Sequence, residues 1–410
     1  MFVVAQLGAR MHYAVPSILE RANLLERLYT DTYAPLALRS ALSVAGKSGP
    51  ASLRRWLGRA PADIPESKIV AFNKLGFEYA WRQKRAAADG SMTAAYLWAG
   101  SEFCRHVINR GLGKASGVYA FNSAGLELLQ FARSQGLFSV VEQTIAPSVI
   151  MARLIEAEET DHPSWVLPHL ADPHRSAFAE RERREWETAD LILCGSEFVR
   201  AGIRAAGGPV DRCRVVPYGV CPPASVPARD FSRTPLRVLT VGAIGLRKGT
   251  PYVLAAARSL RGKAEFRLVG QLHITPQAQK LLSAHVDVAG AAPRSEIQRH
   301  FAWADVFLLP SICEGSATVC YEALAHGLPV IATPNTGSVV RDGVDGFIVP
   351  IRDAEAIAER IERLAGDSEL LAAMSKGALE RASEYTIEEY GKRLLSALVN
   401  ETQSGPHRGA

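Results

Sequence analysis

The sequence lacks several features that mark whole classes of protein. No apolar run reaches the roughly 18 residues that a membrane-spanning helix requires. The six cysteines contain no CxxC pair and are scattered over 410 residues, which excludes a small disulfide scaffold and argues against a zinc site. We therefore expect reduced thiols and a cytoplasmic location. The N-terminus has no basic stretch before its apolar run and no small-residue cleavage site after it, so we interpret it as a first strand.

Charge of one sign is only slightly in excess, with a formal net charge of +5. This balance suits an anionic small substrate or an anionic membrane surface. The basic residues are not interleaved with a row of aromatics, so we expect no nucleic-acid partner. Residues 39–59 carry five basic residues and no acid. Two interpretations of this stretch stay open: a solvated surface, and peripheral contact with an anionic membrane or a lipid-linked substrate.

Apolar runs of strand length alternate with longer helical stretches along the whole chain. Most runs are rich in Val, Ile and Leu without period-2 alternation, which is typical of parallel strands buried on both faces. The expected strands are Met1–Leu7, Val118–Phe121, Phe138–Val141, Leu191–Leu193, Cys213–Val216, Arg237–Val241, Phe266–Val269, Val286–Val288, Val306–Leu309, Val330–Ala332 and Phe347–Val349.

A Pro-rich stretch from Pro222 to Pro235 separates these strands into two series. The pattern predicts an α/β protein with two Rossmann-like, doubly wound domains, residues 1–220 and 221–385, facing each other across a cleft. We expect a helical insertion at about 35–115, a final helix over 386–400 and a disordered tail over 401–410. Thr386 and Glu389 have the spacing of a capping box at the start of that final helix.

The stretch from Ala304 to Thr333 carries the clearest chemical signal. A buried strand ends at Pro310, and the loop Ser-Ile-Cys-Glu-Gly-Ser leads into a helix of about ten residues. Ser316 is the expected N-cap, and Gly315 lets the backbone approach a ligand closely. Free amides at a helix start favour an anion, so we expect a phosphate site here, although no GxxxxGK[ST] loop occurs in the chain.

Two carboxylates flank this helix start. Glu314 lies in the loop, and Glu322 lies in the second turn among apolar neighbours. A partly buried carboxylate needs hydrogen-bond donors, and sugar hydroxyls can supply them. The bland alternative is that Glu322 is an exposed helix residue and Glu314 a cap. The pair alone does not decide between these two interpretations.

The segment Glu314-Gly-Ser-Ala-Thr-Val-Cys-Tyr-Glu322 matches the E-x7-E motif of retaining glycosyltransferases with the GT-B fold. The chain resembles glycosyltransferase family 4, most clearly from Arg237 to about Asp353. The motif stands in an ordered set with VGAIGLRKG (241–249), VGQL (269–272), ADVFLLPS (304–311), ALAHGLPVIAT (323–333) and DGVDGFIVP (342–350). The resemblance implies an acceptor-side N-terminal domain, a C-terminal domain that binds the nucleotide sugar, and a final helix that packs back on the N-terminal domain.

The resemblance also implies roles for individual residues. Glu322 is expected to bind the ribose of the donor nucleotide, and Glu314 the donor sugar. Lys248, with Arg247 beside it, would neutralise the departing diphosphate, which gains negative charge in the transition state. The backbone of Gly315, Ser316, Ala317 and Thr318 would hold the pyrophosphate, while Gly8, Gly270 and Arg294 would approach the donor or frame its base.

Each of these roles has a structural alternative. Lys248 could begin a helix in solvent, Gly8 could be an ordinary turn glycine, and Arg294 could lie on the surface. Of the two adjacent cations, Arg247 and Lys248, only one need face the cleft.

The sequence departs from the family pattern in two places near the expected reaction centre. Ala243 stands where many members have arginine, and Arg247 is the candidate to supply that charge. Many members also carry a histidine after an N-terminal-domain strand, where this chain has Glu142 and Gln143. His12 and His162 are the other candidates for that position.

The resemblance predicts transfer of a sugar, with retention, from a nucleotide diphosphate sugar to an acceptor hydroxyl in glycan, polysaccharide or glycolipid biosynthesis. No D-x-D triplet occurs, which argues against an essential divalent metal, and no cofactor is expected beyond the donor itself. Two alternatives remain: a nucleotide-sugar-binding scaffold without turnover, and a nucleotide-sugar epimerase on the same fold.

Overall fold

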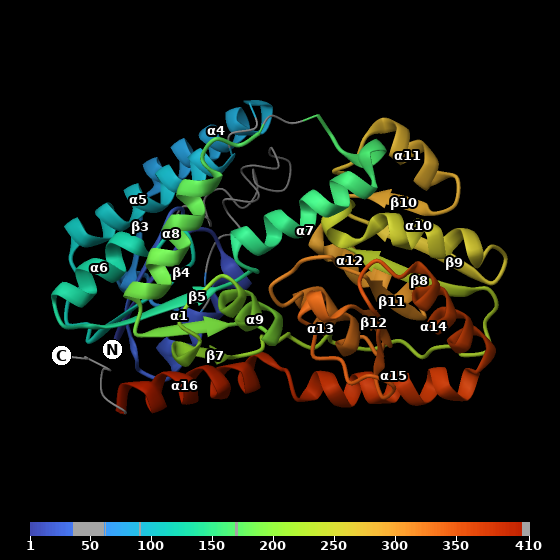
Figure 1. Cartoon of the computed structure of the whole chain (residues 1–410). Coiled ribbons are helices and arrows are strands. Elements are labelled where there is room, and N and C mark those ends of the chain that lie inside the picture. Colours follow the sequence, from blue (N-terminus) through green and yellow to red (C-terminus); the bar gives the residue numbers. More distant parts are fainter. Residues whose placement is uncertain (36–60, 62, 90–91, 169–170, 404–410) are drawn as a thin grey trace.

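Two separate parallel β-sheets form the framework of the computed structural model, which describes residues 1–35, 61, 63–89, 92–168 and 171–403 (Figure 1). The N-terminal sheet has seven strands in the order β3-β2-β1-β4-β5-β6-β7, and the C-terminal sheet has six in the order β10-β9-β8-β11-β12-β13. Every pairing between neighbouring strands is parallel. The predicted fold class is confirmed.

The strands lie close to the predicted runs. In the N-terminal sheet they are β1 (Phe2–Gln6), β2 (Leu25–Thr30), β3 (Ile69–Ala71), β4 (Gly117–Phe121), β5 (Phe138–Gln143), β6 (Leu191–Cys194) and β7 (Cys213–Val215). In the C-terminal sheet they are β8 (Leu236–Val241), β9 (Ala264–Val269), β10 (Asp287–Gly290), β11 (Val306–Leu309), β12 (Val330–Ala332) and β13 (Gly346–Ile348).

Two strands were not predicted. Strand β2 carries Glu26 and Arg27, which interrupt its apolar run, and β3 is a three-residue edge strand whose side chains are all half-buried. The insertion expected to be helical therefore contributes β3 to the sheet before α4 (Asn73–Asp89) and α5 (Met92–Arg110). The basic residues of 39–59, for which two interpretations were left open, lie outside the described part of the chain.

Helices cover both faces of each sheet. One face of the N-terminal sheet packs against α1 (Ala14–Arg21) and α16 (Ile387–Gln403), and the other packs against α5, α6 (Leu126–Ser134), α8 (Arg175–Thr188) and α9 (Glu197–Ala205). The C-terminal sheet packs against α12 (Arg294–Trp303), α13 (Thr318–Ala325) and α15 (Ser368–Ser383) on one face and against α10 (Thr250–Ser259), α11 (Pro276–Ser283) and α14 (Ala354–Gly366) on the other.

Helix α16 crosses from the C-terminal half of the chain to the N-terminal sheet (Figure 1). The backbone N–H of Glu389 donates to the Thr386 side chain at 3.2 Å, so the expected N-cap is present. Tyr390, Leu394 and Leu398 are buried in the cluster that contains the residues of α1. The helix continues to Gln403, so the tail expected to begin at residue 401 is helical in its first residues, and 404–410 lie outside the described range.

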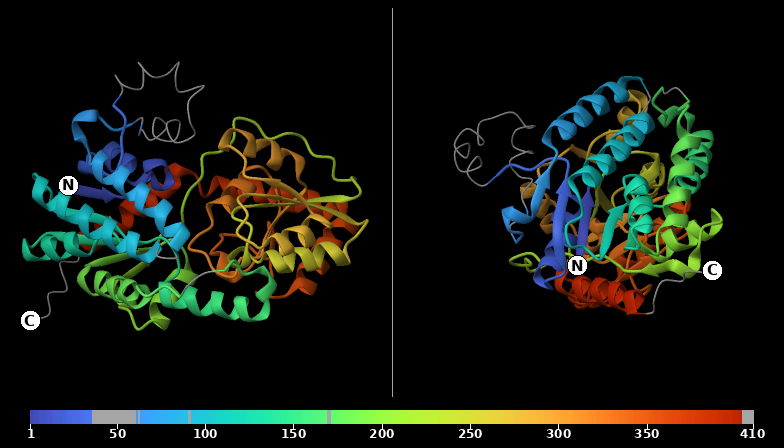
Figure 2. Two further views of the ribbon diagram at one scale, coloured as in Figure 1. Left: turned by 90° about the horizontal axis from the view of Figure 1, so that it is seen from above. Right: turned by 90° about the vertical axis from the view of Figure 1, so that its left-hand side faces the viewer.

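Helix α7 (Ser148–Asp161) crosses in the opposite sense, from the end of β5 to the C-terminal domain (Figure 2). Its Glu158 is fully buried and accepts hydrogen bonds from Tyr252 of α10 at 2.9 Å and from Arg352 at 2.5 Å. The short helix η3 (Pro163–Trp165) follows, and Thr275 donates to the Ser164 carbonyl at 2.6 Å. The α7–η3 segment therefore rests on the C-terminal domain.

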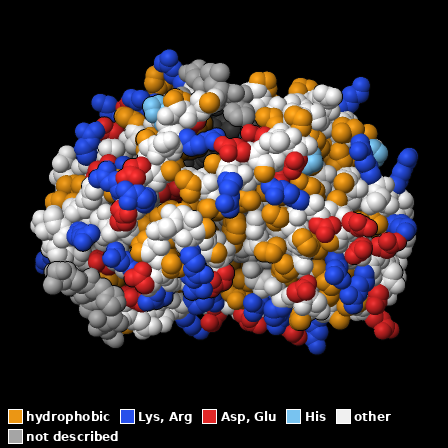
Figure 3. Space-filling model, viewed as in Figure 1, with side chains coloured by type: hydrophobic (Ala, Val, Ile, Leu, Met, Phe, Trp, Pro, Cys, Tyr) orange, Lys and Arg blue, Asp and Glu red, His pale blue; other side chains and the backbone are white. Residues whose placement is uncertain are grey.

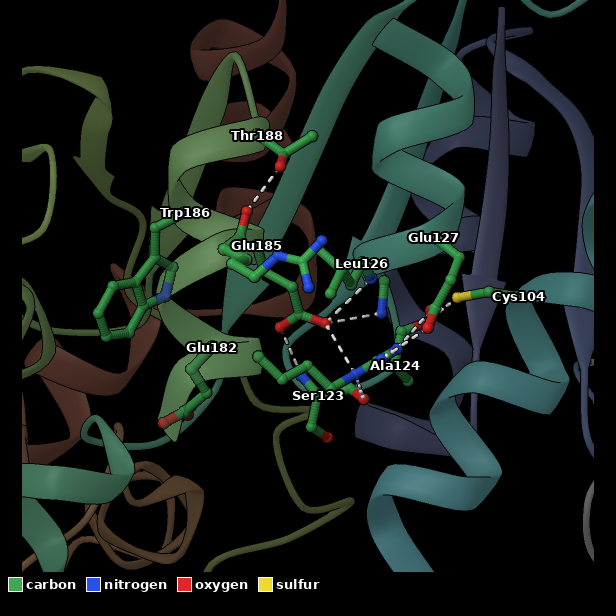
Figure 4. A network of polar contacts seen from close by, with 12 residues as sticks. Cys104, Ser123, Ala124, Leu126, Glu127, Glu182, Glu185, Trp186 and Thr188 are labelled. Atoms are coloured by element: carbon green, nitrogen blue, oxygen red, sulfur yellow. Dashed lines mark hydrogen bonds and ion pairs between the residues drawn. The ribbon is translucent and has the colours of Figure 1, made fainter. Parts of the chain in front are cut away.

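Helix α8 supplies two buried carboxylates that pair with backbone N–H groups at the starts of neighbouring helices. Figure 4 shows the contacts of one of them, Glu185. Glu185 accepts the backbone N–H groups of Ser123, Gly125 and Leu126 at 2.7 to 3.1 Å, at the start of α6. Glu182 accepts the N–H of Ser148, the first residue of α7, at 2.8 Å. Carboxylates at helix starts interact favourably with the helix dipoles, and they accept hydrogen bonds from the first backbone N–H groups, which have no partner within the helix.

Candidate active site

A cavity of about 420 Å³ opens at the carboxyl edge of the C-terminal sheet. Its walls come from the end of β8, the short helix η5 (Leu246–Lys248), the start of α12 and the start of α13. Such a position, beyond the ends of parallel strands, is where open α/β sheets bind ligands. The predicted residues that line it are Lys248, Arg294, Glu314, Ser316, Ala317, Thr318 and Glu322.

Glu314 forms the centre of a charged cluster in this cavity. The Nζ of Lys248 and a guanidinium nitrogen of Arg247 both lie 2.6 Å from the same carboxylate oxygen of Glu314. Glu314 and Lys248 are buried, with 9% and 8% of their surface exposed. Two cations around one carboxylate leave a net positive charge, which is suited to a diphosphate. Both predicted cations therefore contact Glu314, but only Lys248 lines this cavity. Arg247 and Ala243 lie together in the wall of a neighbouring cavity.

Glu322 also lines the cavity and pairs with Arg294 at 3.2 Å. Burial raises the pKa of the Glu322 carboxyl, and the nearby Arg294 opposes that shift. Glu322 is therefore neither an exposed helix residue nor saturated by its one partner, since a carboxylate can accept about four hydrogen bonds. The Arg294 side chain is 71% exposed, as the surface alternative predicted, and it also lines the cavity.

His12 of the N-terminal domain contacts Arg294, which lines the cavity. Its Nε2 accepts a hydrogen bond from Arg294, and burial together with the nearby Arg294 lowers the pKa of His12. The residue stands in η1 (Arg10–Tyr13), where Met11, His12 and Tyr13 have φ values of 43°, 52° and 63°. Three successive left-handed residues are costly for side chains with a Cβ, so this turn is held in place by its surroundings.

The start of α13 differs from the prediction in detail. The helix begins at Thr318, its N-cap position is Ala317, and it runs for eight residues. The expectation that Ser316 caps this helix is wrong, because its hydroxyl bonds Tyr321 at 2.7 Å and the Gly337 carbonyl at 3.0 Å. The backbone N–H of Ala317 is occupied by the carbonyl of Thr336 at 3.2 Å. No side chain caps the helix, and Thr318 and Val319 line the cavity.

Gly315 and Gly270 are required by protein neighbours, and Gly8 by its backbone conformation. A Cβ at Gly315 would lie 1.9 Å from the Thr144 carbonyl oxygen, and one at Gly270 would lie 1.7 Å from that of Gly242. Gly8 has a φ of 78°, and its N–H donates to Asp31 at 2.9 Å. None of these three glycines is among the residues that line the cavity, so the close approach expected between Gly315 and a ligand is an approach between the two domains.

Three of the four candidates for the missing histidine are held in other contacts. Glu142 is buried and accepts hydrogen bonds from Tyr119 and Tyr218, and burial raises its pKa. Gln143 donates to Glu182 and accepts from a tryptophan of α8. His162 lies 3.2 Å from the Tyr252 hydroxyl, at the far end of α7. Of the four candidates, His12 alone touches a residue that lines the cavity.

Five further residues complete the cavity wall: Ala292, from the loop expected to frame the base, and Val241, Gly242, Ile297 and Val319, for which no role was predicted. Ile297 stands three residues after Arg294 on α12, so helical spacing from that residue could have found it. Val241 and Gly242 lie at the end of β8 and Val319 in the first turn of α13, so these three could have been found from the predicted ends of those elements. Within the described residues, no group of three or more His, Cys, Asp or Glu side chains is placed to hold a metal ion. The described helices also include none with the length and apolar character needed to cross a bilayer.

Known proteins are similar to this chain in sequence, and others are similar to it in fold. Residues 235–367 match the family model "Glycosyl transferases group 1". The amylovoran biosynthesis glycosyltransferase AmsK of Erwinia amylovora is 29% identical over 217 residues, which cover 48% of this chain and 53% of that protein. The putative colanic acid biosynthesis glycosyltransferase WcaL of Escherichia coli K12 is 29% identical over 260 residues, 57% of this chain and 60% of that protein. The chain thus spans little more than half the length of these curated relatives.

The fold similarity extends over nearly the whole chain. Sucrose-phosphate synthase from Thermosynechococcus elongatus superposes with a TM-score of 0.65 at 17% identity, covering 98% of this chain and 99% of the other. HepE of Anabaena, solved in complex with UDP and glucose, gives a TM-score of 0.60 at 14% identity, covering 97% and 99%. The chain is therefore a protein of GT-B fold that carries a group 1 glycosyltransferase domain over residues 235–367.

Proposed function

We propose that this protein is a retaining glycosyltransferase that moves a sugar from a nucleotide diphosphate sugar to an acceptor hydroxyl in polysaccharide or glycolipid biosynthesis. The observation that carries the proposal is the cluster of Arg247, Lys248 and Glu314 beside the uncapped start of α13. A diphosphate fits this positive cluster, and Glu322 lies in the same cavity to accept the ribose hydroxyls.

The proposed chemistry follows from the groups that face the cavity. The bond between the anomeric carbon and the diphosphate oxygen breaks while the acceptor oxygen attacks from the same face. Attack from that face retains the configuration. The acceptor proton passes to the leaving phosphate oxygen, so no protein base is needed. Arg247 and Lys248 stabilise the charge that develops on the leaving group. This route agrees with Glu142, Gln143 and His162 being engaged in other contacts.

The same two cations support metal-independent transfer. They supply the positive charge that a divalent ion would otherwise bring to a departing diphosphate. We propose that the donor is the only small molecule the reaction needs besides its acceptor. Activity that is unchanged after treatment with a chelator would support this part of the proposal, and activity restored only by added Mg²⁺ or Mn²⁺ would refute it.

We also propose that the protein works at the cytoplasmic surface of an anionic membrane. All six cysteines are free, as in a reducing compartment. Helix α4 exposes Phe77 and Trp81, with 57% and 53% of their surfaces accessible, and Lys84 and Arg85 are exposed on the same helix. Aromatic side chains beside cations are typical of segments that settle at an anionic headgroup layer. On the face in Figure 3, by contrast, Lys and Arg are interspersed with Asp and Glu and form no continuous basic stripe.

The test of the main proposal is incubation with a panel of labelled UDP-, GDP-, ADP- and TDP-sugars, followed by analysis of products with and without acceptors. Transfer or slow hydrolysis supports the glycosyltransferase. Binding without turnover favours the scaffold, and interconversion of free nucleotide sugars favours the epimerase. A thermal-shift screen identifies the base beforehand, because a ligand at 100 times its Kd stabilises the protein by about 2.7 kcal/mol.

A further inference from the structure

The loop that carries Glu314 is held by residues of both domains. On the side of the C-terminal domain, the N–H of Glu314 donates to the Asn335 carbonyl at 3.1 Å. On the side of the N-terminal domain, the Glu314 carbonyl accepts from the N–H of Ala146, in the segment that follows β5, at 3.2 Å. The Ser196 hydroxyl, between β6 and α9, donates to the Gly315 carbonyl at 2.5 Å. Two successive carbonyls of this loop therefore accept hydrogen bonds from the opposite domain.

The contact between Ser196 and this loop is closely packed. Ser196 is 6% exposed. A Cβ at Gly337 would lie 2.3 Å from the Gly315 carbonyl oxygen and 2.6 Å from the Ser196 Oγ, and a Cβ at Gly315 would lie 1.9 Å from the Thr144 carbonyl oxygen. The hydrogen bond from Ser196 to Gly315 is therefore buried, and neighbouring backbone leaves the loop little room to settle in another position.

Ser196 is itself fixed by a second hydrogen bond. It is the N-cap of α9, and its Oγ accepts the N–H of Val199 at 3.3 Å. Val199 and Ile203 anchor α9 in the core of the N-terminal domain, where both are fully buried. A hydroxyl that accepts one hydrogen bond can still donate its proton, and here it donates to the Gly315 carbonyl. The helix cap thus extends a rigid part of the N-terminal domain to the Glu314 loop, as α9 and α13 face each other in Figure 1.

The position of Glu314 determines the geometry of the charged cluster, because its carboxylate is the shared partner of Arg247 and Lys248. Glu314 stands in the loop between β11 and α13. Sites built on loops are held less precisely than sites built on helices or strands, so the contacts to the loop must supply the precision. A displacement of about 1 Å at a reacting centre can lower the rate about 100-fold.

From this arrangement we propose that Ser196 is a positioning residue of the N-terminal domain, which holds Glu314 where the reaction requires it. The proposal rests on the proposed glycosyltransferase function. Ser196 does not line the donor cavity, whose lining residues all belong to the C-terminal domain. Loss of the Ser196 hydroxyl should therefore lower kcat and leave nucleotide affinity nearly unchanged.

Two variants disturb the contact from opposite sides. Ser196→Gly removes the hydroxyl and keeps a residue that is tolerated at a helix N-cap. We expect kcat for sugar transfer, or for donor hydrolysis where no acceptor has been found, to fall at least ten-fold, with the Kd for the nucleoside diphosphate within three-fold of the parent. Gly337→Ala should have the same effect, because its methyl group forces the Gly315 carbonyl away from Ser196.

Thr275→Gly is the matched control. Thr275 also caps a helix, α11, and its hydroxyl also donates to a carbonyl, that of Ser164 after α7, at 2.6 Å. This side chain makes the same two kinds of contact as Ser196 but none with the Glu314 loop. Its kcat should stay within two-fold of the parent, and urea unfolding should show that all variants are folded.

A double-mutant cycle distinguishes the positioning of Glu314 from a general loosening of the domains. In the Glu314→Gln background, Ser196→Gly should lower the single-turnover rate by less than a further two-fold, because the carboxylate that it positions is already absent. A further ten-fold loss in that background would overturn the proposal. It would also be overturned by an unchanged kcat in Ser196→Gly, or by a loss of nucleotide affinity as large as the loss of kcat.

The parent protein separates the two levels of inference. A parent that transfers sugar, together with any of these three results, keeps the proposed function and refutes the role of Ser196. A parent that neither transfers nor hydrolyses any donor in the panel refutes the proposed function, and the role of Ser196 with it.

Discussion

Replacement of Lys248 by methionine gives the sharpest test of the charged cluster. Methionine keeps an unbranched apolar side chain of similar length but removes the ammonium that lies 2.6 Å from Glu314. Arg247 still neutralises the carboxylate, so the variant should fold. A lost hydrogen bond from a charged group is worth about 1.5–3 kcal/mol, which corresponds to a rise of about 10- to 150-fold in the Kd for a nucleoside diphosphate.

The same geometry predicts how stability responds. With one cation removed, Glu314 keeps the other, and the free energy of unfolding should fall by about 1–2 kcal/mol. With Lys248 and Arg247 both replaced by methionine, the carboxylate is left buried and unpaired, which costs about 3–5 kcal/mol. The loss in the double variant should therefore exceed the sum of the two single losses.

Isothermal titration calorimetry and urea unfolding measure the two effects. Lys263→Met is the control, because that side chain is 59% exposed and pairs with Glu362 on the surface. Affinity within two-fold of the parent in Lys248→Met would show that the ammonium does not hold the diphosphate, and additive stability losses would show that the two cations do not share Glu314. Either result would refute the assignment of this cluster as the leaving-group site.

Burial raises the pKa of the Glu322 carboxyl, and hydroxyl donors favour its ionised form, so the affinity of the parent for nucleotide should fall as the pH drops below that raised pKa. Glu322→Gln should flatten this pH dependence, and calorimetry that gives parallel pH profiles for the two proteins would contradict the prediction. Burial raises the pKa of Glu185 to about 7 from 4.5. Glu185 therefore contributes about 3 kcal/mol to the free energy of unfolding at a pH below its unfolded pKa. This contribution is lost as the pH rises through about 7. Urea unfolding across this range should show a steeper loss of stability with rising pH in the parent than in Glu185→Gln. The double variant Trp81→Ala/Arg85→Glu should cosediment with phosphatidylglycerol vesicles at least five-fold less than the parent. The control Leu281→Ala, at a leucine that is 40% exposed on α11, should cosediment as the parent does. Equal losses in the two variants would contradict a role for α4.

The sheets could be predicted because their strands are buried on both faces. Val306–Leu309, for example, is fully buried and reads as an unbroken apolar run. Strand β2 escaped because Glu26 and Arg27 are half-buried members of a strand near the sheet edge, where charge is tolerated. The domain boundaries drawn at residues 220 and 385 stay predictions.

The site could be predicted where one local segment carries it and not where it is assembled from distant ones. The spacing of Glu314 and Glu322 places both carboxylates in one cavity, as the structure has them. Ser316 has the right residue type for a cap, but its hydroxyl takes tertiary partners that no local pattern reveals. The contact between His12 and Arg294 joins residues 282 positions apart, and nothing in the sequence near either residue indicates it. The catalytic roles themselves stay predictions.

The two crossing helices restrict how the cleft can open. Helix α7 is bonded to the C-terminal domain through Glu158, and α16 is buried against the N-terminal domain through Tyr390. Pulling the domains straight apart would tear both attachments and expose a carboxylate and an aromatic core. A twist about the line that joins the two attachments breaks neither. We therefore expect the cleft to open for substrates by rotation of one domain against the other. Each domain expressed alone should be insoluble, because its crossing helix would lack the surface on which it packs.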